Sequence, residues 1–433
     1  MVKPASTGPD TPRGATVVGE VAEFQGLYGA YHVSETLLQK VWMRGEFDLS
    51  RACLTSGEAV RILRPGAWNR LSGPDFRGAR LQVGDRLLTG DVEVHFRAEA
   101  WFQHGHDADP AYDEVIVHVV LFPPAPGAAC ARTRSGREIP VLVLVDLLWH
   151  DLEEYASDEA VAALRGRDPL PLIEELLTLP LAEREAKMRE AAERRWLEKV
   201  YFAGRRIARV GWDQACHLTT LEVLGYRANR VAMMRVGEHF PWPVWQKEFP
   251  PVDELTAVAA EWWSLRGVRP ANQPRLRLAQ YRAWTQRVPD WPVRLRNLAL
   301  PGVPAGAAEL SATALRKRTD LPRWRAVLQQ DLCSGGFSGT RFDTWVCNLI
   351  LPFRASLGGA EVESQFWQIW YPGDAPESHL RALRHLAVPG SAAARTNGHL
   401  QALLGLQLAR VDPSDAGTGP NPSPDSASDG GQD

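Results

Sequence analysis

The sequence predicts an α/β or α+β N-terminal domain followed by a mostly α-helical domain. Between residues 59 and 147, short runs rich in Val, Ile and Leu alternate with turns that contain Gly or Asp, which is typical of β-strands. Residues 181–210 are instead dominated by Glu, Arg, Lys, Ala and Leu, the composition of a long amphipathic helix. The pattern changes near residue 150, and we expect domains over residues 30–150 and 170–405.

Both ends of the chain differ from this pattern. Residues 1–20 and 412–433 are rich in Pro, Gly, Ser, Thr and Asp, so they cannot bury enough apolar surface and we expect them to be disordered. The 433 residues contain five widely spaced cysteines without a Cys-x-x-Cys pair, which favours reduced thiols over a disulfide framework. No apolar run is long enough to span a bilayer, so we expect a cytoplasmic protein that does not associate with membranes.

The first domain begins with a helix and continues with strands. Ser34 is a good N-cap, and apolar residues recur at helical spacing from Leu37 to Trp42. Gly84 and Asp85 form a tight turn that makes the strands on either side antiparallel. The strands expected after this helix are 59–63, 76–83, 87–96, 114–122 and 138–147, with a short helix at 98–104.

The second domain is read as a succession of helices. We expect them at 181–210, 213–224, 252–265 and 274–287, separated by Gly and Pro. Between residues 181 and 300 there are 21 Lys and Arg against 13 Asp and Glu, although the formal net charge of the whole chain is −3. This surplus fits a solvated helical surface about as well as a phosphate-binding face.

Acidic residues and a histidine alternate along the third strand. Asp91, Glu93 and His95 fall at every second position, so a strand places them on one face. Asp75 starts the preceding strand of the hairpin and should lie close to Glu93 and His95. Converging carboxylates suit a hard cation, and we expect Asp75, Asp91 and Glu93 to bind Mg²⁺ or Mn²⁺.

A second group of ionisable residues follows. His104 and His106 form a His-x-His pair that could bind a transition metal, which would indicate a different metal-dependent hydrolase. The alternative is that both histidines cap a turn. His118 lies within a Val-rich strand, where a lone histidine is more often a core residue than a ligand.

Pro74-Asp75 and Glu93-Val94-His95 together resemble the PD-(D/E)XK nuclease superfamily, whose core is a helix, three strands, a helix and a strand. The resemblance implies that Asp75 and Glu93 hold divalent metal, and that His95 takes the place of the usual Lys. His104 or His106 would then assist at the scissile phosphate. The departure at His95 leaves the position of the general base open.

The resulting hypothesis is a metal-dependent phosphodiesterase that acts on DNA or RNA, with Asp75, Glu93, His95, His104 and His106 as its catalytic residues. The alternative is a non-catalytic adaptor with a degenerate nuclease-like fold, which binds a ligand or nucleic acid. Geometry discriminates between them, because a structural role would leave the carboxylates scattered or paired with arginines.

Other polar and aromatic residues allow a functional and a structural interpretation. Glu35 could add a metal ligand, but a Glu in the first turn is also explained by the helix dipole. Trp68 and Trp101 could stack on bases or fill the core. The segments 225–230 and 269–274 carry Arg and Asn that could hold phosphate or cap helices.

Several short motifs together are similar to a bacterial family without established activity, domain-of-unknown-function family 2851. The resemblance covers roughly residues 30–405 and implies no mechanism. Its motifs are Gly73-Pro74-Asp75-Phe76, residues 90–95, Trp101 with His104 and His106, Ala111-Tyr112, residues 117–120, Gly225-Tyr226 with Asn229-Arg230, Arg269-Pro270 with Asn272 and Pro274, and Asn348 with Pro352-Phe353.

Overall fold

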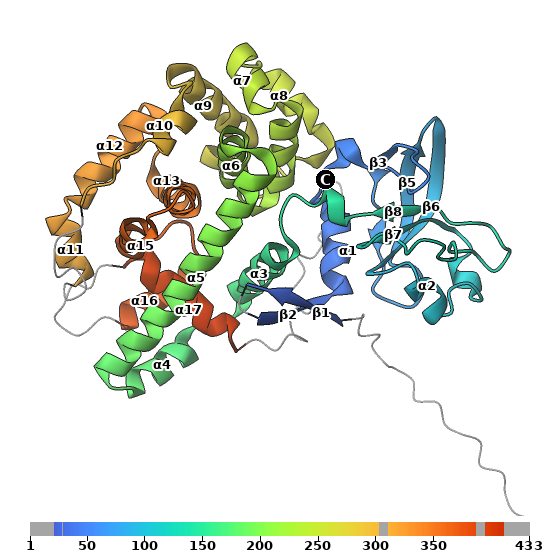
Figure 1. The fold of residues 1–433 in the computed structure, drawn as a ribbon, viewed down its shortest axis with the longest axis horizontal. Coiled ribbons are helices and arrows are strands. Elements are labelled where there is room, and N and C mark those ends of the chain that lie inside the picture. Colours follow the sequence, from blue (N-terminus) through green and yellow to red (C-terminus); the bar gives the residue numbers. More distant parts are fainter. Residues whose placement is uncertain (1–20, 28, 303–310, 387–394, 411–433) are drawn as a thin grey trace, which may run out of the picture. The chain divides into compact units, whose positions relative to one another are not determined.

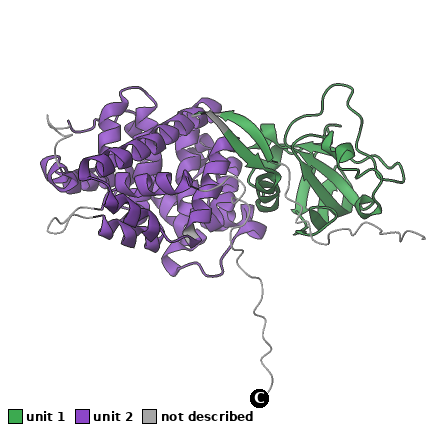
Figure 2. Ribbon diagram, turned by 90° about the horizontal axis from the view of Figure 1, so that it is seen from below, with its two compact units in different colours: residues 1–149 green, residues 150–433 purple. Residues whose placement is uncertain are grey.

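The computed structural model describes residues 21–27, 29–302, 311–386 and 395–410. The chain divides into two compact units, residues 1–149 and 150–433 (Figure 2). The two terminal segments expected to be disordered, residues 1–20 and 412–433, lie outside the described residues. Among the described residues, no helix combines the length and the apolar composition needed to cross a bilayer.

The first unit is a mixed α/β structure (Figure 1). The sheet order is β3-β5-β6-β7-β8, with β4 paired to β5. Strands β3, β5 and β6 are antiparallel neighbours, whereas β7 pairs in parallel with β6, and β8 pairs in parallel with β7. Its elements are β1 (Val21–Gly26), β2 (Gly29–Ser34), α1 (Glu35–Arg44), β3 (Val60–Arg64), β4 (Ala67–Trp68), β5 (Phe76–Val83), β6 (Arg86–His95), α2 (Ala100–Gln103), β7 (Val115–Val120) and β8 (Val141–Val143).

These elements follow the expected order, with three differences, of which the first is the short strand β4, which was not expected. The strand expected over 138–147 is wrong in length, because β8 covers only Val141–Val143 and a 3₁₀ turn at Val145–Leu147 follows it. Leu144 N and Val145 N still bond to Val120 O and Leu121 O, and the chain then leaves the sheet because Leu147 N bonds to Leu144 O and closes the 3₁₀ turn. A β1–β2 hairpin also precedes α1, and the sequence analysis did not anticipate it.

One face of the sheet forms the core of this unit. Leu81 and Val92 are buried, as is Trp42 of α1, the helix that lies against β6. The residues of the opposite face follow from the strand register, because residues that pair directly across neighbouring strands lie on the same side of the sheet. On that face Arg61 pairs with Gln82, and Arg64 pairs with Arg80.

This opposite face continues along β6. Arg80 pairs with Thr89, and from Thr89 every second residue of β6 leads to Glu93 and His95. The end of the face near Arg80 is exposed, whereas Glu93 and His95 are buried. A solvent-exposed sheet surface therefore leads into a buried polar site.

The second unit is α-helical. Its described helices are α3 (Leu152–Ala163), α4 (Leu170–Thr178), α5 (Leu181–Val210), α6 (Trp212–His239), α7 (Trp242–Glu248), α8 (Val252–Val258), α9 (Pro274–Arg287), α10 (Trp291–Arg296), α11 (Ala312–Arg318), α12 (Leu321–Cys333), α13 (Gly339–Trp345), a π-helix (Val346–Ile350), α14 (Leu351–Ala355), α15 (Ala360–Ile369), α16 (Glu377–His385) and α17 (Asn397–Leu408). Helices α5 and α9 have the expected bounds. The helix expected over 252–265 is too long, because α8 ends at Val258 and a 3₁₀ turn follows.

Helix α6 reverses direction part-way along its length. A straight helix would separate residues 23 positions apart by roughly 35 Å. Instead, Gln214 Nε2 donates to Gly237 O at 3.2 Å, and His217 lies 3.1 Å from Phe240 O. The backbone is non-helical at Tyr226 and Asn229, so α6 is a helical hairpin whose turn follows Gly225. This turn falls just after the expected helix end at Leu224.

Candidate functional site

Parallel pairing of β6 and β7 brings several ionisable residues together in the first unit. Glu93 on β6 is in register with His118 on β7. The segment after α2 adds His104 and His106, and Asp75 lies just before β5. Glu93, His95, His106 and His118 are buried, whereas His104 is exposed. Sequence positions up to 43 residues apart thus form one site, with its open side at His104.

Three histidines have the spacing of a metal site. His95, His104 and His106 each place one ring nitrogen within 4.8 Å of the other two. His104 Nδ1 lies 3.2 Å from His95 Nε2. Glu93 Oε1 lies 3.4 Å from His95 Nε2 and 3.3 Å from His106 Nε2. Three imidazole nitrogens and one carboxylate oxygen therefore surround a common point.

Two buried nitrogens in this group have no hydrogen-bond partner among the described residues. They are His106 Nε2, despite its proximity to Glu93, and His118 Nδ1. The other nitrogen of His118, Nε2, lies 2.8 Å from His95 Nδ1. Buried polar atoms are seldom left without a partner, so His106 Nε2 is the buried atom of this group that is available to bind a ligand.

Asp75 connects the start of β5 to the end of β6. Its backbone N–H donates to Glu93 Oε2 at 2.9 Å, and its Oδ2 accepts from Val94 N at 3.0 Å. Its Oδ1 accepts from Gln39 Nε2 of α1 at 2.7 Å, and Gln39 Oε1 accepts from Trp68 Nε1. Asp75 therefore lies beside Glu93, as expected, but both of its carboxylate oxygens bond to groups of the protein.

Asp91 bonds to the neighbouring strand through one of its carboxylate oxygens. Its Oδ1 accepts a hydrogen bond at 3.0 Å from the backbone of Gly78, within the β5 bulge. The adjacent Gly90 has no room for a side chain, because a Cβ would lie 2.4 Å from Ile116 Cγ2. Asp91 therefore lies on β6 as predicted, and its hydrogen bond is to the bulge of β5.

Burial disfavours charge throughout the site. It raises the pKa of Glu93 to about 8. Burial, followed by the proximity of Glu93, raises the pKa of Asp75 well above its usual value. Burial lowers the pKa of His106 to about 4 and of His118 to about 3, and, together with its histidine neighbours, it lowers the pKa of His95. These three histidines are therefore neutral at pH 7, the form in which imidazole binds metal.

Aromatic rings enclose the histidines. Tyr112 stacks on His106 with ring centroids 3.8 Å apart, and burial raises the pKa of its hydroxyl. Trp101 lies edge-on to both rings and donates its N–H to Arg132 O at 2.9 Å. Trp101 is fully buried, so of its two interpretations the structure selects the core. Trp68 is half-buried and lies under Arg70.

Sequence reasoning missed Gln39 and Tyr112. Gln39 lies on α1, far from the motif in sequence, and its role depends on the end of β5 reaching that helix. Tyr112 was noted only within a motif, and its proximity to His106 could have been suspected from the few residues between them. Glu35 is buried at the start of α1.

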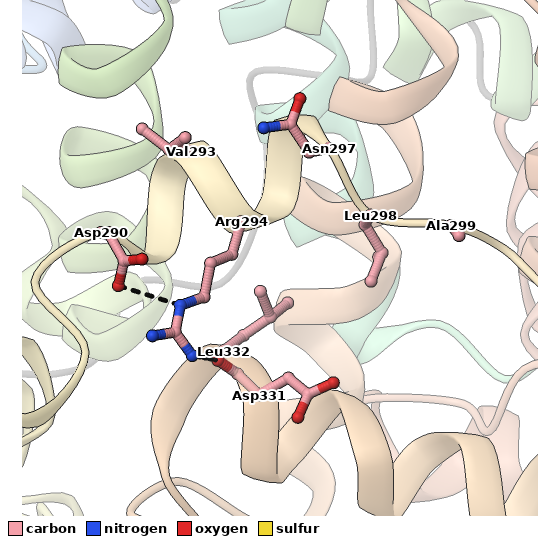
Figure 3. A pocket seen from close by; sticks show the side chains of 8 residues that line it. All are labelled: Asp290, Val293, Arg294, Asn297, Leu298, Ala299, Asp331 and Leu332. Carbon is pink, nitrogen blue, oxygen red and sulfur yellow. Dashed lines mark hydrogen bonds and ion pairs between the residues drawn. The ribbon is translucent and has the colours of Figure 1, made fainter.

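A pocket in the second unit contains Arg294, whose charge is paired with Asp290 (Figure 3). Arg294 Nε donates to Asp290 Oδ1 at 2.9 Å, and Arg294 Nη1 donates to Asp331 O at 3.3 Å. The pocket lies between α10 and α12. The side chains that line this pocket do not bring several ligand atoms close together, as the histidines of the first unit do.

The sequence profile of a protein family of unknown function, DUF2851, matches residues 35–259, which is more than half of the chain. The chain belongs to this family. The matched segment includes every residue of the histidine site and the hairpin of α6. No curated protein and no solved structure matches the chain. The family membership thus covers the site without assigning it a function.

Proposed function

We propose that the first unit is a metal-dependent phosphodiesterase that acts on nucleic acid, with a divalent ion held by His95, His104, His106 and Glu93. The observation that carries this proposal is the convergence of their ligand atoms around the buried Nε2 of His106, which lacks a hydrogen-bond partner among the described residues. Neutral imidazoles next to Glu93, which would release its proton when the ion binds, are a suitable ligand set for a cation.

This ligand set modifies the metal site expected from the sequence. Three imidazoles favour Mn²⁺ or Zn²⁺ over Mg²⁺, which prefers oxygen ligands. Asp75 would orient Glu93 rather than bind the ion, because its own oxygens accept from Val94 and Gln39. His118 would fix the ring of His95 through the 2.8 Å contact, as the outer partners of metal-bound histidines commonly do.

The bound ion would polarise a phosphoryl oxygen and lower the pKa of a water molecule. The protein supplies the surroundings of that chemistry. Trp101 and Tyr112 cover the inner side of the histidines and exclude water there. His104, the exposed member, lies on the side from which a substrate has access, where it can contact the phosphate or the leaving group.

Two observations support nucleic acid as the substrate. First, α1, then β3, β5 and β6, then α2 and β7 follow the element order of the nuclease superfamily that the motifs resemble. Second, the exposed sheet face that leads to Glu93 carries Arg61, Arg64 and Arg80, which form no ion pair among the described residues. Free arginines on such a face can contact successive phosphates.

Neighbouring arginines do not neutralise the carboxylates of the site. Arg64, Arg70 and Arg97 make no ion pair with Asp75 or Glu93 within the described part of the chain. Arg70 lies over the ring of Trp68, and Arg97 over that of Phe122. This arrangement favours a binding role over a set of structural salt bridges.

The test is cleavage of single- and double-stranded DNA and RNA by metal-depleted protein to which Mn²⁺, Zn²⁺ or Mg²⁺ is returned. We expect cleavage with Mn²⁺ or Zn²⁺, and loss of both cleavage and metal binding in His106→Ala and Glu93→Gln. His32→Ala is the matched control, because His32 is an exposed histidine of the same unit. Metal-dependent cleavage that survives in His106→Ala would refute the proposed ligand set.

A non-catalytic adaptor is the second candidate, and the burial of most of the cluster favours it. Glu93, His95 and His106 are each less than 10% exposed, which suits a structural metal as well as a catalytic one. Calorimetry separates the two candidates. Tight metal binding together with nucleic-acid binding, but without cleavage of any substrate, would select the adaptor.

A further inference from the structure

The turn of the α6 hairpin contains a strained tyrosine. Tyr226 has φ 54° and ψ −167°, a conformation that glycine adopts readily and other residues rarely do. The preceding Gly225 is held close to the returning chain, since a Cβ there would lie 3.0 Å from Arg230 Cα. Such strain persists only where the surroundings enforce it, and here it fixes the direction of the Tyr226 side chain.

The hydroxyl of Tyr226 accepts a hydrogen bond from a buried arginine, Arg277. It donates to Asn272 Oδ1 at 2.6 Å, and Arg277 Nη2 donates to the same two groups, at 3.1 Å to the hydroxyl and 2.8 Å to Asn272. Arg277 Nη1 donates to Gln280 Oε1 at 3.0 Å. The side chains that bond Arg277 are therefore all neutral.

Arg277 is an unusual buried cation. The residue is 9% exposed, its Nε is buried without a hydrogen-bond partner, and no carboxylate lies within ion-pair distance among the described residues. It also lies in the first turn of α9, where the helix dipole disfavours a positive charge. Buried charges are normally paired, so this position lacks an anion.

A second arginine reaches the same tyrosine. The Arg341 guanidinium carbon lies 3.1 Å from the centroid of the Tyr226 ring, and its Nη1 donates to Val223 O. Arg341 also pairs with Asp374, which is about one third exposed. Asp374 thus pairs with Arg341, whereas Arg277 has no carboxylate within ion-pair distance among the described residues.

We propose that Arg277, Tyr226 and Asn272, with Arg341 behind the tyrosine ring, form a binding site for a phosphate group. Guanidinium groups bind phosphate oxygens through paired, charge-assisted hydrogen bonds. Tyr226 and Asn272 are half-buried, so the site reaches the surface. It lies in the second unit and does not depend on the metal site of the first.

The test measures the binding of inorganic phosphate to the full chain by calorimetry and by thermal denaturation, against chloride at equal ionic strength. We expect saturable, stabilising binding, and an affinity reduced by at least about 10-fold in Arg277→Met. Arg275→Met is the matched control, because Arg275 is an exposed arginine of the same helix that pairs with Asp253. It should bind phosphate like the wild type.

Two further variants keep the test decisive if Arg277→Met does not fold. Arg277→Lys retains the charge but loses the planar fork, and Tyr226→Phe removes only the hydroxyl. Both should weaken phosphate binding while circular dichroism stays unchanged. Equal phosphate affinity in the wild type and in either of these folded variants would overturn the assignment.

The phosphate could be a free ion or part of a nucleic-acid backbone. A short single-stranded oligonucleotide distinguishes these sources. Binding of inorganic phosphate alone supports a free ion or a small phosphorylated ligand. Binding of the oligonucleotide alone, weakened in Arg277→Met but not in Arg275→Met, supports the backbone. If neither probe binds the wild type in an Arg277-dependent manner, the proposal is wrong.

Discussion

Replacement of Glu93 by Gln should change how the stability of the metal-free protein depends on pH. Burial raises the pKa of Glu93 to about 8, whereas the same carboxyl in the unfolded chain titrates near 4.5. A raised pKa in the folded state contributes stability that is fully present below pH 4.5 and is lost as the pH rises towards 8. Gln cannot ionise, so Glu93→Gln should gain stability relative to the wild type over this interval.

The magnitude follows from proton linkage. Each proton held only by the folded state lowers the free energy of unfolding by about 1.4 kcal/mol per pH unit. Between pH 6.5 and 8 the unfolded histidines are largely neutral, so Glu93 contributes a loss of about 2 kcal/mol there. Below pH 6.5 the lowered pKa values of His95, His106 and His118 act in the opposite direction, because only the unfolded chain then binds their protons. The raised pKa of Asp75 acts in the same direction as that of Glu93, and three histidines outweigh these two carboxyls below pH 6.5, so the site as a whole should be most stable near pH 6.5.

Native-state hydrogen exchange of the β6 and β7 amides measures this effect locally, in protein treated with EDTA and after correction for intrinsic exchange. The stability of Glu93→Gln relative to the wild type should rise by about 2 kcal/mol from pH 6.5 to pH 8. Glu99→Gln, which replaces an exposed carboxyl of the same unit, is the control and should show no such change. A difference between Glu93→Gln and the wild type that does not vary with pH would refute the reasoning.

Three further outcomes are expected. Gly90→Ala should destabilise the first unit by about 1–3 kcal/mol in urea denaturation, because its Cβ would lie 2.4 Å from Ile116 Cγ2. Arg206→Met should cost about 1–3 kcal/mol, since it removes one of the cations that pair with Glu222, which keeps Arg230, whereas loss of the exposed ion pair in Arg205→Met should cost no more than about 1 kcal/mol. Removal of metal by a chelator should lower the thermal midpoint of the first unit, and addition of Mn²⁺ or Zn²⁺ should restore it; an unchanged midpoint would count against a bound ion.

Local patterns were sufficient for much of the first unit. The alternation from Phe76 to Val83 and the Gly84-Asp85 turn predicted β5 and its hairpin with β6, because both signals reside in neighbouring residues. Edge elements were harder to predict. The strand expected over 138–147 was too long, since the 3₁₀ turn at Val145–Leu147 ends β8 although the residues there are as apolar as those of the strand.

The sequence by itself determined which residues of the site could be chemically active, because the period of a strand places Glu93 and His95 on one face whatever surrounds them. It also placed Asp75 beside Glu93, since a hairpin joins the two segments. Only the tertiary structure decided which atoms remain available to a ligand. The bulge engages Asp91, α1 engages Asp75 through Gln39, and parallel addition of β7 brings His118 to His95, so that the histidines form the centre. These contacts join segments distant in sequence, and no local pattern encodes them.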